Sequence, residues 1–290
     1  MSAALALSLS SSMCFGVALV TGRVGLRSLD ARSGAAISIP TATLLFALAA
    51  PFAFDSAGFT IRAALWFGVV GLFFPALVTI LTFRSNQQLG PTITSAVSGT
   101  APLFALLAAG ALLGEEVPAQ AALACVAIVA GVTVLTWKQD AVRPGFTGRA
   151  LIWPIAGAVV RGLAQAGAKA GLALWPSPFA ASLIGYVVSS ATVIGANQVG
   201  RSKRPPLTKH GFVWFALTGG LNGGAVLLMY AALSVAPVSL VAPVVATYPL
   251  MTVLVSAIVL REERVTLRMV AGATTMVLAI ACLAASQAGA

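Results

Sequence analysis

Three polar side chains on one apolar segment are the residues of this chain best suited to bind a charged ligand. Arg161, Gln165 and Lys169 are spaced by four, so on a helix they form one polar stripe. A cation at the centre of a membrane helix costs at least about 2.5 kcal/mol, and it is expected to face a cavity or a partner. Arg161 could bind a carboxylate or phosphate through two parallel N–H donors. Alternatively, it could bind free carbonyls of a broken helix, and Lys169, near the segment end, could reach the membrane interface.

Proline and glycine interrupt apolar segments at corresponding places of the two halves of the chain. Pro75 ends the run Phe73-Phe74-Pro75, which matches Gly220-Leu221-Asn222 at a shift of 147. Proline removes a helical hydrogen bond, and glycine permits bending and close approach of a ligand. We therefore predict that Asn222 lines a central site and that the hinge points are Pro75, Gly219, Gly220, Gly223 and Gly224. Close helix packing alone is the alternative role for these glycines.

A second matched pair consists of Thr100 and Thr247, each two residues before a proline within an apolar segment. Tyr248 follows one of them, and Tyr230 lies in the preceding segment. Either threonine could instead bond its own helix backbone. The predicted substrate-binding set is Arg161, Gln165, Asn222, Thr247, Tyr248, Thr100 and Tyr230.

Groups for acid, base or metal chemistry are missing from the apolar segments. All seven acids fall in predicted loops: Asp30, Asp55, Glu115, Glu116, Asp140, Glu262 and Glu263. The one histidine, His210, lies in a basic loop, and Cys14, Cys125 and Cys282 are dispersed. This inventory argues against proton coupling through a buried carboxylate and against an enzyme, because no group can act as general acid or base. We expect no catalytic residue, no metal and no cofactor.

The elements that must position these residues are membrane helices. With 59% hydrophobic and 8% charged residues, the chain has too little polar surface for a water-soluble globule of 290 residues. A helix needs roughly 20 apolar residues to span the hydrocarbon core. The predicted fold is an all-α membrane protein with ten transmembrane helices, at 3–22, 35–54, 63–83, 91–114, 118–137, 150–172, 178–199, 211–233, 238–260 and 269–286.

The two halves of the chain match each other. Gly16, Arg23 and Gly25 meet Gly162, Lys169 and Gly171 at a shift of 146, while Thr100, Pro102 and Glu115 meet Thr247, Pro249 and Glu262 at 147. We predict two five-helix repeats, 1–140 and 150–290, joined by the loop 141–149. An odd number of helices inserts the second repeat upside down, so the repeats are inverted, an architecture of transporters with a midplane site.

Basic residues are sorted to one face of the predicted bundle. Of the 17 Lys and Arg residues, 14 lie in or beside the loops of that face, Arg62 lies on the other face, and Arg161 and Lys169 lie in a span. The positive-inside rule makes the basic face cytoplasmic and places both termini outside. The net charge of +10 then marks membrane-surface loops and predicts no nucleic-acid partner.

The order of motifs resembles the EamA-type transporters of the drug/metabolite transporter superfamily, over nearly the whole chain. The second half resembles the family most, through Tyr230-Ala231-Ala232-Leu233, Ala236 to Pro249, Leu260-Arg261-Glu262-Glu263 and Val270-Ala271-Gly272-Ala273. The first half repeats Pro102 and Leu113-Gly114-Glu115-Glu116, but Phe83-Arg84 replaces the aromatic-Ala step and Cys125 stands opposite Gly272. Members of this type commonly resemble a bundle with cytoplasmic termini, the reverse of the orientation that the loop charges favour here.

The resemblance implies a carrier that exports or exchanges small metabolites. Together with Arg161, it favours an amino acid or organic anion moved by alternating access in a bacterial inner membrane. The expected partners are a small-molecule solute and the lipid bilayer, with a homo-oligomer possible. The alternatives are an exporter of amphipathic drugs, which a mostly apolar wall would suit, and a non-transporting membrane protein, either a lipid-handling enzyme or a scaffold.

Overall fold

All regular elements in the described part of the chain are helices. The computed structural model describes residues 2–136, 148–199 and 207–260, together with 271, 272, 274, 275, 278, 279 and 282. Most of the tenth predicted segment, 269–286, lies outside these residues. The helices are α1 Ser2–Gly25, α2 Ala31–Ala53, α3 Ile61–Phe73, α4 Ala76–Ser98, α5 Ala101–Leu113, α6 Ala119–Thr136, the 3-10 helix η1 Gly148–Leu151, α7 Ile152–Leu174, α8 Pro178–Val199, α9 Lys209–Val235, α10 Val238–Val245 and α11 Tyr248–Val259.

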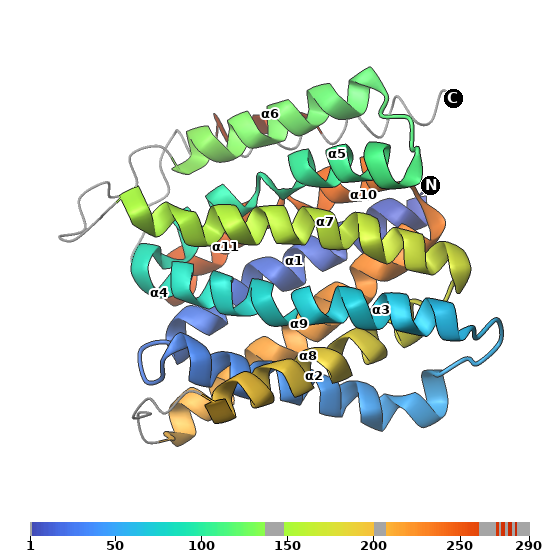
Figure 1. The fold of residues 1–290 in the computed structure, drawn as a ribbon. Coiled ribbons are helices and arrows are strands. Elements are labelled where there is room, and N and C mark those ends of the chain that lie inside the picture. Colours follow the sequence, from blue (N-terminus) through green and yellow to red (C-terminus); the bar gives the residue numbers. More distant parts are fainter. Residues whose placement is uncertain are drawn as a thin grey trace.

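The helices form a bundle in which most run along a common direction (Figure 1). Within the described ranges, seven helical segments are long and apolar enough to cross a membrane, and α5 and part of α6 are shorter apolar helices. Many large apolar side chains on these helices are exposed, such as Leu48, Leu65 and Leu107. Such a surface suits a hydrocarbon environment, because lipid is as apolar as these side chains.

The third predicted segment, 63–83, is two helices rather than one. α3 ends at Phe73, and Phe74 is extended with φ −135° and ψ 119° before α4 begins at Ala76. A proline disfavours helical backbone angles at the residue before it, here Phe74, and Pro75 itself has no N–H that could donate a helical hydrogen bond. The interruption predicted at Pro75 is therefore a complete break of the helix.

The fourth and ninth predicted segments, 91–114 and 238–260, are also each divided, and at corresponding points. Gly90, with φ 81°, separates the last turns of α4 from its first part. α4 then ends at Ser98 and α5 starts at Ala101, just as α10 ends at Val245 and α11 starts at Tyr248. Pro102 and Pro249 lie in the first turn of α5 and α11, where the lack of an N–H is tolerated. Val238–Val259 is long and apolar enough to be one membrane span, and within each of the two predicted segments a new helix begins at a proline.

The glycine-rich segment 219–224, in contrast, lies inside an unbroken helix. α9 is continuous from Lys209 to Val235. A Cβ on Gly219 would meet the Ser38 carbonyl oxygen, and one on Gly223 would lie 3.1 Å from the Ala42 Cβ. These two glycines therefore let α9 approach α2 closely, as the packing alternative requires. A hinge role for the segment stays a prediction.

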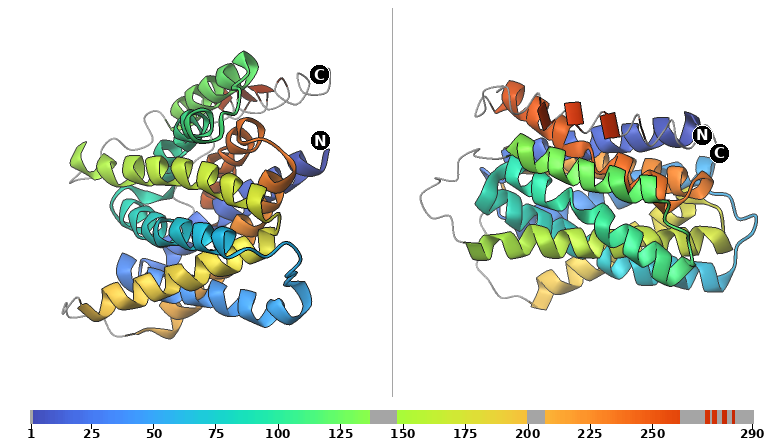
Figure 2. Two further views of the ribbon diagram at one scale, coloured as in Figure 1. Left: turned by 45° about the vertical axis from the view of Figure 1, so that its right-hand side comes forward. Right: turned by 90° about the horizontal axis from the view of Figure 1, so that it is seen from above.

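The first helix of each half packs against helices of the other half. α1 packs on α9 and α11, while α7 packs on α3, α4 and α5. A Cβ on Gly16 would lie 2.8 Å from the Tyr248 carbonyl oxygen, and one on Gly162 would lie 2.7 Å from the Ala101 carbonyl oxygen. The views in Figure 2 show the same interleaving from two further sides. In each half, the backbone of a divided helical segment therefore lies in close contact with the first helix of the other half.

Candidate functional site

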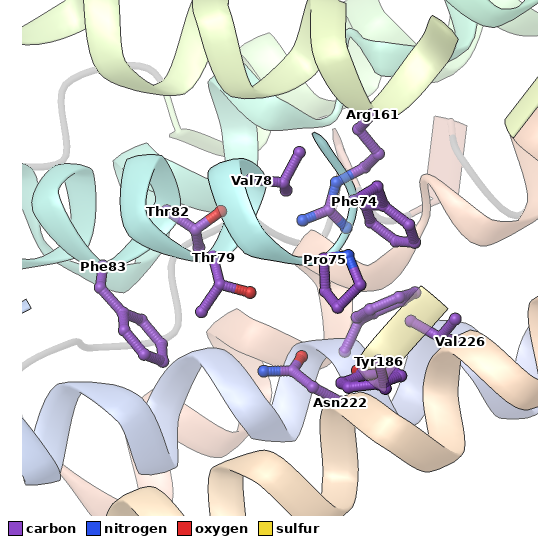
Figure 3. Close-up of a pocket in the computed structure, with 11 residues that line it drawn as sticks. Phe74, Pro75, Val78, Thr79, Thr82, Phe83, Arg161, Tyr186, Asn222 and Val226 are labelled. Atoms are coloured by element: carbon purple, nitrogen blue, oxygen red, sulfur yellow. The ribbon is translucent and has the colours of Figure 1, made fainter. Parts of the chain in front are cut away.

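Two small adjoining cavities lie in the interior where α1, α4, α7 and α9 meet. Their volumes are about 30 Å³ and about 20 Å³. Both are lined by Phe15, Thr82, Phe83, Arg161 and Asn222. The first also contacts Phe74, Pro75, Val78, Thr79, Tyr186 and Val226, which Figure 3 shows around the same space, and the second also contacts Ala18, Leu19 and Tyr248. We call these two cavities together the central cavity.

Arg161 brings a charge to the wall of the central cavity. Its side chain is only 7% exposed, and the guanidinium carbon lies 5.0 Å from the centroid of the Phe15 ring and 5.6 Å from that of Tyr248. Nε and Nη1 are buried and have no hydrogen-bond partner among residues 2–136, 148–199 and 207–260. Ring faces attract a desolvated cation by about 2 kcal/mol or more. The rings do not occupy the donors at Nε and Nη1, so the guanidinium can still bind an anionic ligand.

Polar groups from other helices face the same space as Arg161. Asn222 of α9 lies across the cavity from the guanidinium in Figure 3, and Thr79 and Thr82 project from α4. The Tyr186 hydroxyl of α8 is buried and has no partner in the described ranges. The central cavity thus combines a fixed positive charge with several uncharged hydrogen-bonding groups on mainly aromatic walls.

The structure brings some of the predicted binding residues together and leaves others apart. Arg161, Asn222, Tyr248 and the hinge residue Pro75 line the central cavity. Gln165 is buried one turn further along α7 and is not among the lining residues of either part of the cavity. Tyr230 lies behind the wall, with its ring centroid 6.5 Å from that of Phe74.

The two threonines bond backbone carbonyls of their own predicted segments, as in the alternative interpretation, and the acceptors lie in the last turn of the preceding helix. Thr100 Oγ1 donates to the Val97 carbonyl at 2.7 Å, and Thr247 Oγ1 donates to the Val244 carbonyl at 2.7 Å. Thr247 Oγ1 also lies 3.1 Å from Ser12 Oγ. The two bonds occupy corresponding positions, and each adds to the backbone N–H bond that the same carbonyl accepts from Thr100 or Thr247. Neither threonine lines the central cavity.

Most of the cavity wall was missed by reasoning from the sequence. Phe15, Phe74, Phe83 and Tyr186 are aromatic residues in apolar segments, where their types carry no signal beyond packing. The positions of Thr79 and Thr82 did indicate a place in the site, because these residues follow Pro75 by four and seven residues and so share its helix face. The position of Phe15, though not its residue type, also indicated a place in the site, since Phe15 corresponds to Arg161 in the first half.

Lys169 and Arg23, which correspond to each other in the two halves, bind helix ends instead of the cavity. Lys169 Nζ donates to the carbonyls of Leu233 at 2.7 Å and Ala236 at 3.0 Å. Arg23 Nη1 donates to the carbonyls of Asn86 at 2.9 Å and Gln87 at 3.2 Å. These are charge-assisted bonds to the C-terminal ends of helical segments, where a cation is favoured.

The size of the central cavity restricts what it holds in this conformation. A water needs roughly 10 to 15 Å³ measured in this way, so 30 Å³ admits only a few water molecules. An organic solute therefore requires the surrounding helices to move apart. The geometry is that of a site too narrow for an organic solute, with a cation at its wall whose Nε and Nη1 have no partner among the described residues.

The sequence matches the model of the EamA-like transporter family twice, over residues 2–137 and 148–285. Among solved structures, 28 chains match, and one described as "Crystal structure of protein" is similar with a TM-score of 0.77 at 14% sequence identity. That alignment covers 98% of this chain and 96% of the other. At this identity the likeness shows the fold. No curated protein matches the sequence.

Proposed function

The chain belongs to the EamA-like transporter family of the drug/metabolite transporter superfamily, and from this premise we propose that it carries a small organic anion or amino acid by alternating access. Membership makes it an integral membrane transporter with two repeats. The substrate and the mechanism are the proposal. The observation that carries it is the Arg161 guanidinium, which is buried at the wall of the central cavity with Nε and Nη1 unpartnered among the described residues.

An uncompensated buried cation has a large desolvation cost, which an anionic ligand removes. A carboxylate placed in the central cavity would accept a charge-assisted hydrogen bond from Nε or from Nη1 of Arg161, which lie on different edges of the guanidinium. Asn222 and the Tyr186 hydroxyl would supply further donors from the opposite wall. The solute then gains its affinity from interactions that the empty protein lacks.

The remaining wall favours a solute with an apolar part. Phe15, Phe74 and Phe83 supply ring surface around the polar groups. An amino acid or organic acid with an apolar side group fits both features. The same aromatic wall supports the second candidate, an exporter of amphipathic drugs, in which Arg161 would not determine selectivity.

The broken helices provide the moving parts of the proposed mechanism. α4 with α5, and α10 with α11, are divided at corresponding positions, and each pair packs against the first helix of the other half. We propose two inverted five-helix repeats, 1–140 and 150–290, with ten spans in all, which rock about the central cavity. Gln165, Tyr230, Thr100 and Thr247 then support the wall from behind it.

Orientation and location belong to the same proposal. The basic face is assigned to the cytoplasm of a bacterial cell, and both termini to the outside of its inner membrane. Export or exchange of the solute is part of this proposal, and it is supported by the resemblance to the family rather than by a particular residue. A non-transporting role as a lipid-handling enzyme or scaffold would make no use of an unpaired cation at mid-helix, and this favours the carrier.

The test is solute flux into proteoliposomes, with labelled amino acids, organic acids and a cationic dye as substrates. The variant is Arg161→Met, and Arg62→Met is the control because Arg62 is an exposed residue of α3. We expect uptake of an anionic solute by the parent protein and the control, and a loss of at least about tenfold in Arg161→Met. Dye flux without anion flux would favour the drug exporter. Anion flux equal in parent and Arg161→Met would overturn the assignment of Arg161.

A further inference from the structure

The junction between α9 and α10 is held by two opposite charges, one from the loop between α5 and α6 and one from α7. The Glu115 carboxylate accepts from the N–H groups of Val238, at 3.1 Å, and Ser239, at 3.4 Å, in the first turn of α10. Lys169 donates to the last carbonyls of α9, at Leu233 and Ala236. An anion at a helix N-terminus and a cation at a helix C-terminus are both stabilising. The two charges also attract each other across the junction.

A corresponding contact exists at the matching junction in the first half. Arg23, the counterpart of Lys169, donates to the carbonyl of Asn86, which is the counterpart of Leu233 at a shift of 147. Asn86 precedes the Gly90 kink of α4, as Leu233 precedes the break between α9 and α10. Each contact therefore ties the first helix of one half to the segment that leads into a broken helix of the same half. The counterpart of Glu115, Glu262, lies outside the described residues.

The two contacts lie at opposite ends of the bundle. Arg23 is two residues from the end of α1, and α1 ends at the left of Figure 1. Glu115 lies in the loop between α5 and α6, and Lys169 lies in the last two turns of α7; this loop and this end of α7 are at the right of Figure 1. Arg161 is eight residues before Lys169, which on a helix is about 12 Å. The central cavity lies between the two contacts.

We propose that Glu115 with Lys169 holds the central cavity closed toward the non-basic face, and that Arg23 holds it closed toward the basic face. The proposal rests on the proposed alternating access, since it assigns a residue to each of the two closures. These residues are positioning residues, because they act through the ends of α4, α9 and α10. In this structure, with both contacts made, the two parts of the central cavity have volumes of about 30 Å³ and about 20 Å³.

The proposal predicts that variants of the two contacts open the cavity toward opposite faces. A merely structural role would not distinguish between the two faces. Glu115→Gln weakens the bonds to α10 without changing the size of the side chain, so the cavity opens more often toward the non-basic face. Lys169→Met should also make the cavity open more often toward the non-basic face. Arg23→Met removes the bonds to Asn86 and Gln87, so the cavity opens more often toward the basic face.

The test measures access to the central cavity from each side separately. Thr82→Cys places a thiol on the cavity wall, in a background with Cys14, Cys125 and Cys282 replaced by alanine. A membrane-impermeant methanethiosulfonate reagent is added to right-side-out and to inside-out vesicles, and the labelling rate is compared. Glu116→Gln and Arg32→Met are the matched controls, because both side chains are exposed neighbours of like charge.

We expect Glu115→Gln and Lys169→Met to raise labelling from the non-basic face about tenfold, equivalent to about 1.4 kcal/mol. Arg23→Met should raise labelling only from the basic face, and both controls should match the parent. Equal acceleration from both faces, acceleration on the same face by all three variants, or no acceleration would overturn the proposal. Labelling requires no substrate, so these outcomes are distinct from a failure of the proteoliposome flux test, which would overturn the proposed function.

Discussion

Arg161 and Phe15 occupy corresponding positions of the two halves, and they contact each other, with the guanidinium carbon 5.0 Å from the ring centroid. Two positions related by a two-fold axis can touch only near that axis. The contact therefore supports a site on the axis between inverted repeats. It also makes the site asymmetric, because one copy supplies the charge and the other supplies the ring that faces it.

Replacing Phe15 by leucine is expected to weaken solute binding more than it affects the maximum rate. Phe15 supplies one of the two rings that contact the Arg161 guanidinium, so its loss removes about half of an attraction of about 2 kcal/mol, or about 1 kcal/mol. We predict a KM for the anionic solute raised about fivefold, measured by proteoliposome flux over a range of concentrations. An unchanged KM together with a lower maximum rate would assign Phe15 to the movement of the helices instead.

The Tyr186 hydroxyl provides a test of direct contact with the solute. It is buried at the cavity wall and has no partner in the described parts of the chain, so Tyr186→Phe should not lower the midpoint of thermal unfolding. A hydrogen bond to a charged ligand contributes about 1.5 to 3 kcal/mol. We therefore expect KM to rise by at least about tenfold. Unchanged KM in a folded variant would contradict a role for this hydroxyl in binding.

Gly162→Ala should destabilise the protein, because its new Cβ would lie 2.7 Å from both the Ala101 carbonyl oxygen and the Ala105 nitrogen. Backbone atoms cannot yield without moving α5 away from α7. Overpacking of this kind costs about 1 to 3 kcal/mol. The measurement is thermal unfolding in detergent, with Gly157→Ala as the control, since its Cβ would lie 3.7 Å from its nearest neighbour. Equal midpoints for the two variants would contradict the close contact.

The orientation inferred from the loop charges can be tested with single cysteines in the cysteine-free background. Arg27→Cys, in the exposed turn after α1, should react with an impermeant thiol reagent only in inside-out vesicles. Ala57→Cys, in the loop between α2 and α3, should react only in right-side-out vesicles. The reverse pattern would place the termini in the cytoplasm, as is common in the family.

The sequence predicted the helices well where hydrophobic length alone determines them, as in α1, α2, α8 and α9. It placed the breaks less well, because the effect of a proline depends on where its ring falls within the helix. Pro102 and Pro249 were identified as matched, but they begin a new helix rather than bend an existing one. Gly90 was read as a loop residue before a span and proved to be a kink within α4.

The candidate site was predictable to the extent that it contains unusual residue types. Arg161 and Asn222 were identifiable because a charge or an amide inside a membrane helix is costly. The aromatic wall could not be deduced in this way, since Phe74 and Tyr186 resemble any other apolar residue of a span. Gln165 shares the stripe of Arg161 but is buried outside the cavity wall, because a helix face is wider than the cavity it borders.

The packing of α1 against α11 joins two helices that are far apart in the sequence. Thr252 Oγ1 reaches the Gly16 carbonyl across 236 residues of sequence. At 5 to 20 residues per second, a ribosome needs roughly 10 to 50 s to make the chain between them. During this time α1 is in the membrane without its partner, and its serine-rich face, with Ser8, Ser11 and Ser12, is exposed to lipid or to other proteins. Assembly of the bundle thus depends on whether α1 is kept from other contacts in the membrane until α11 has been made.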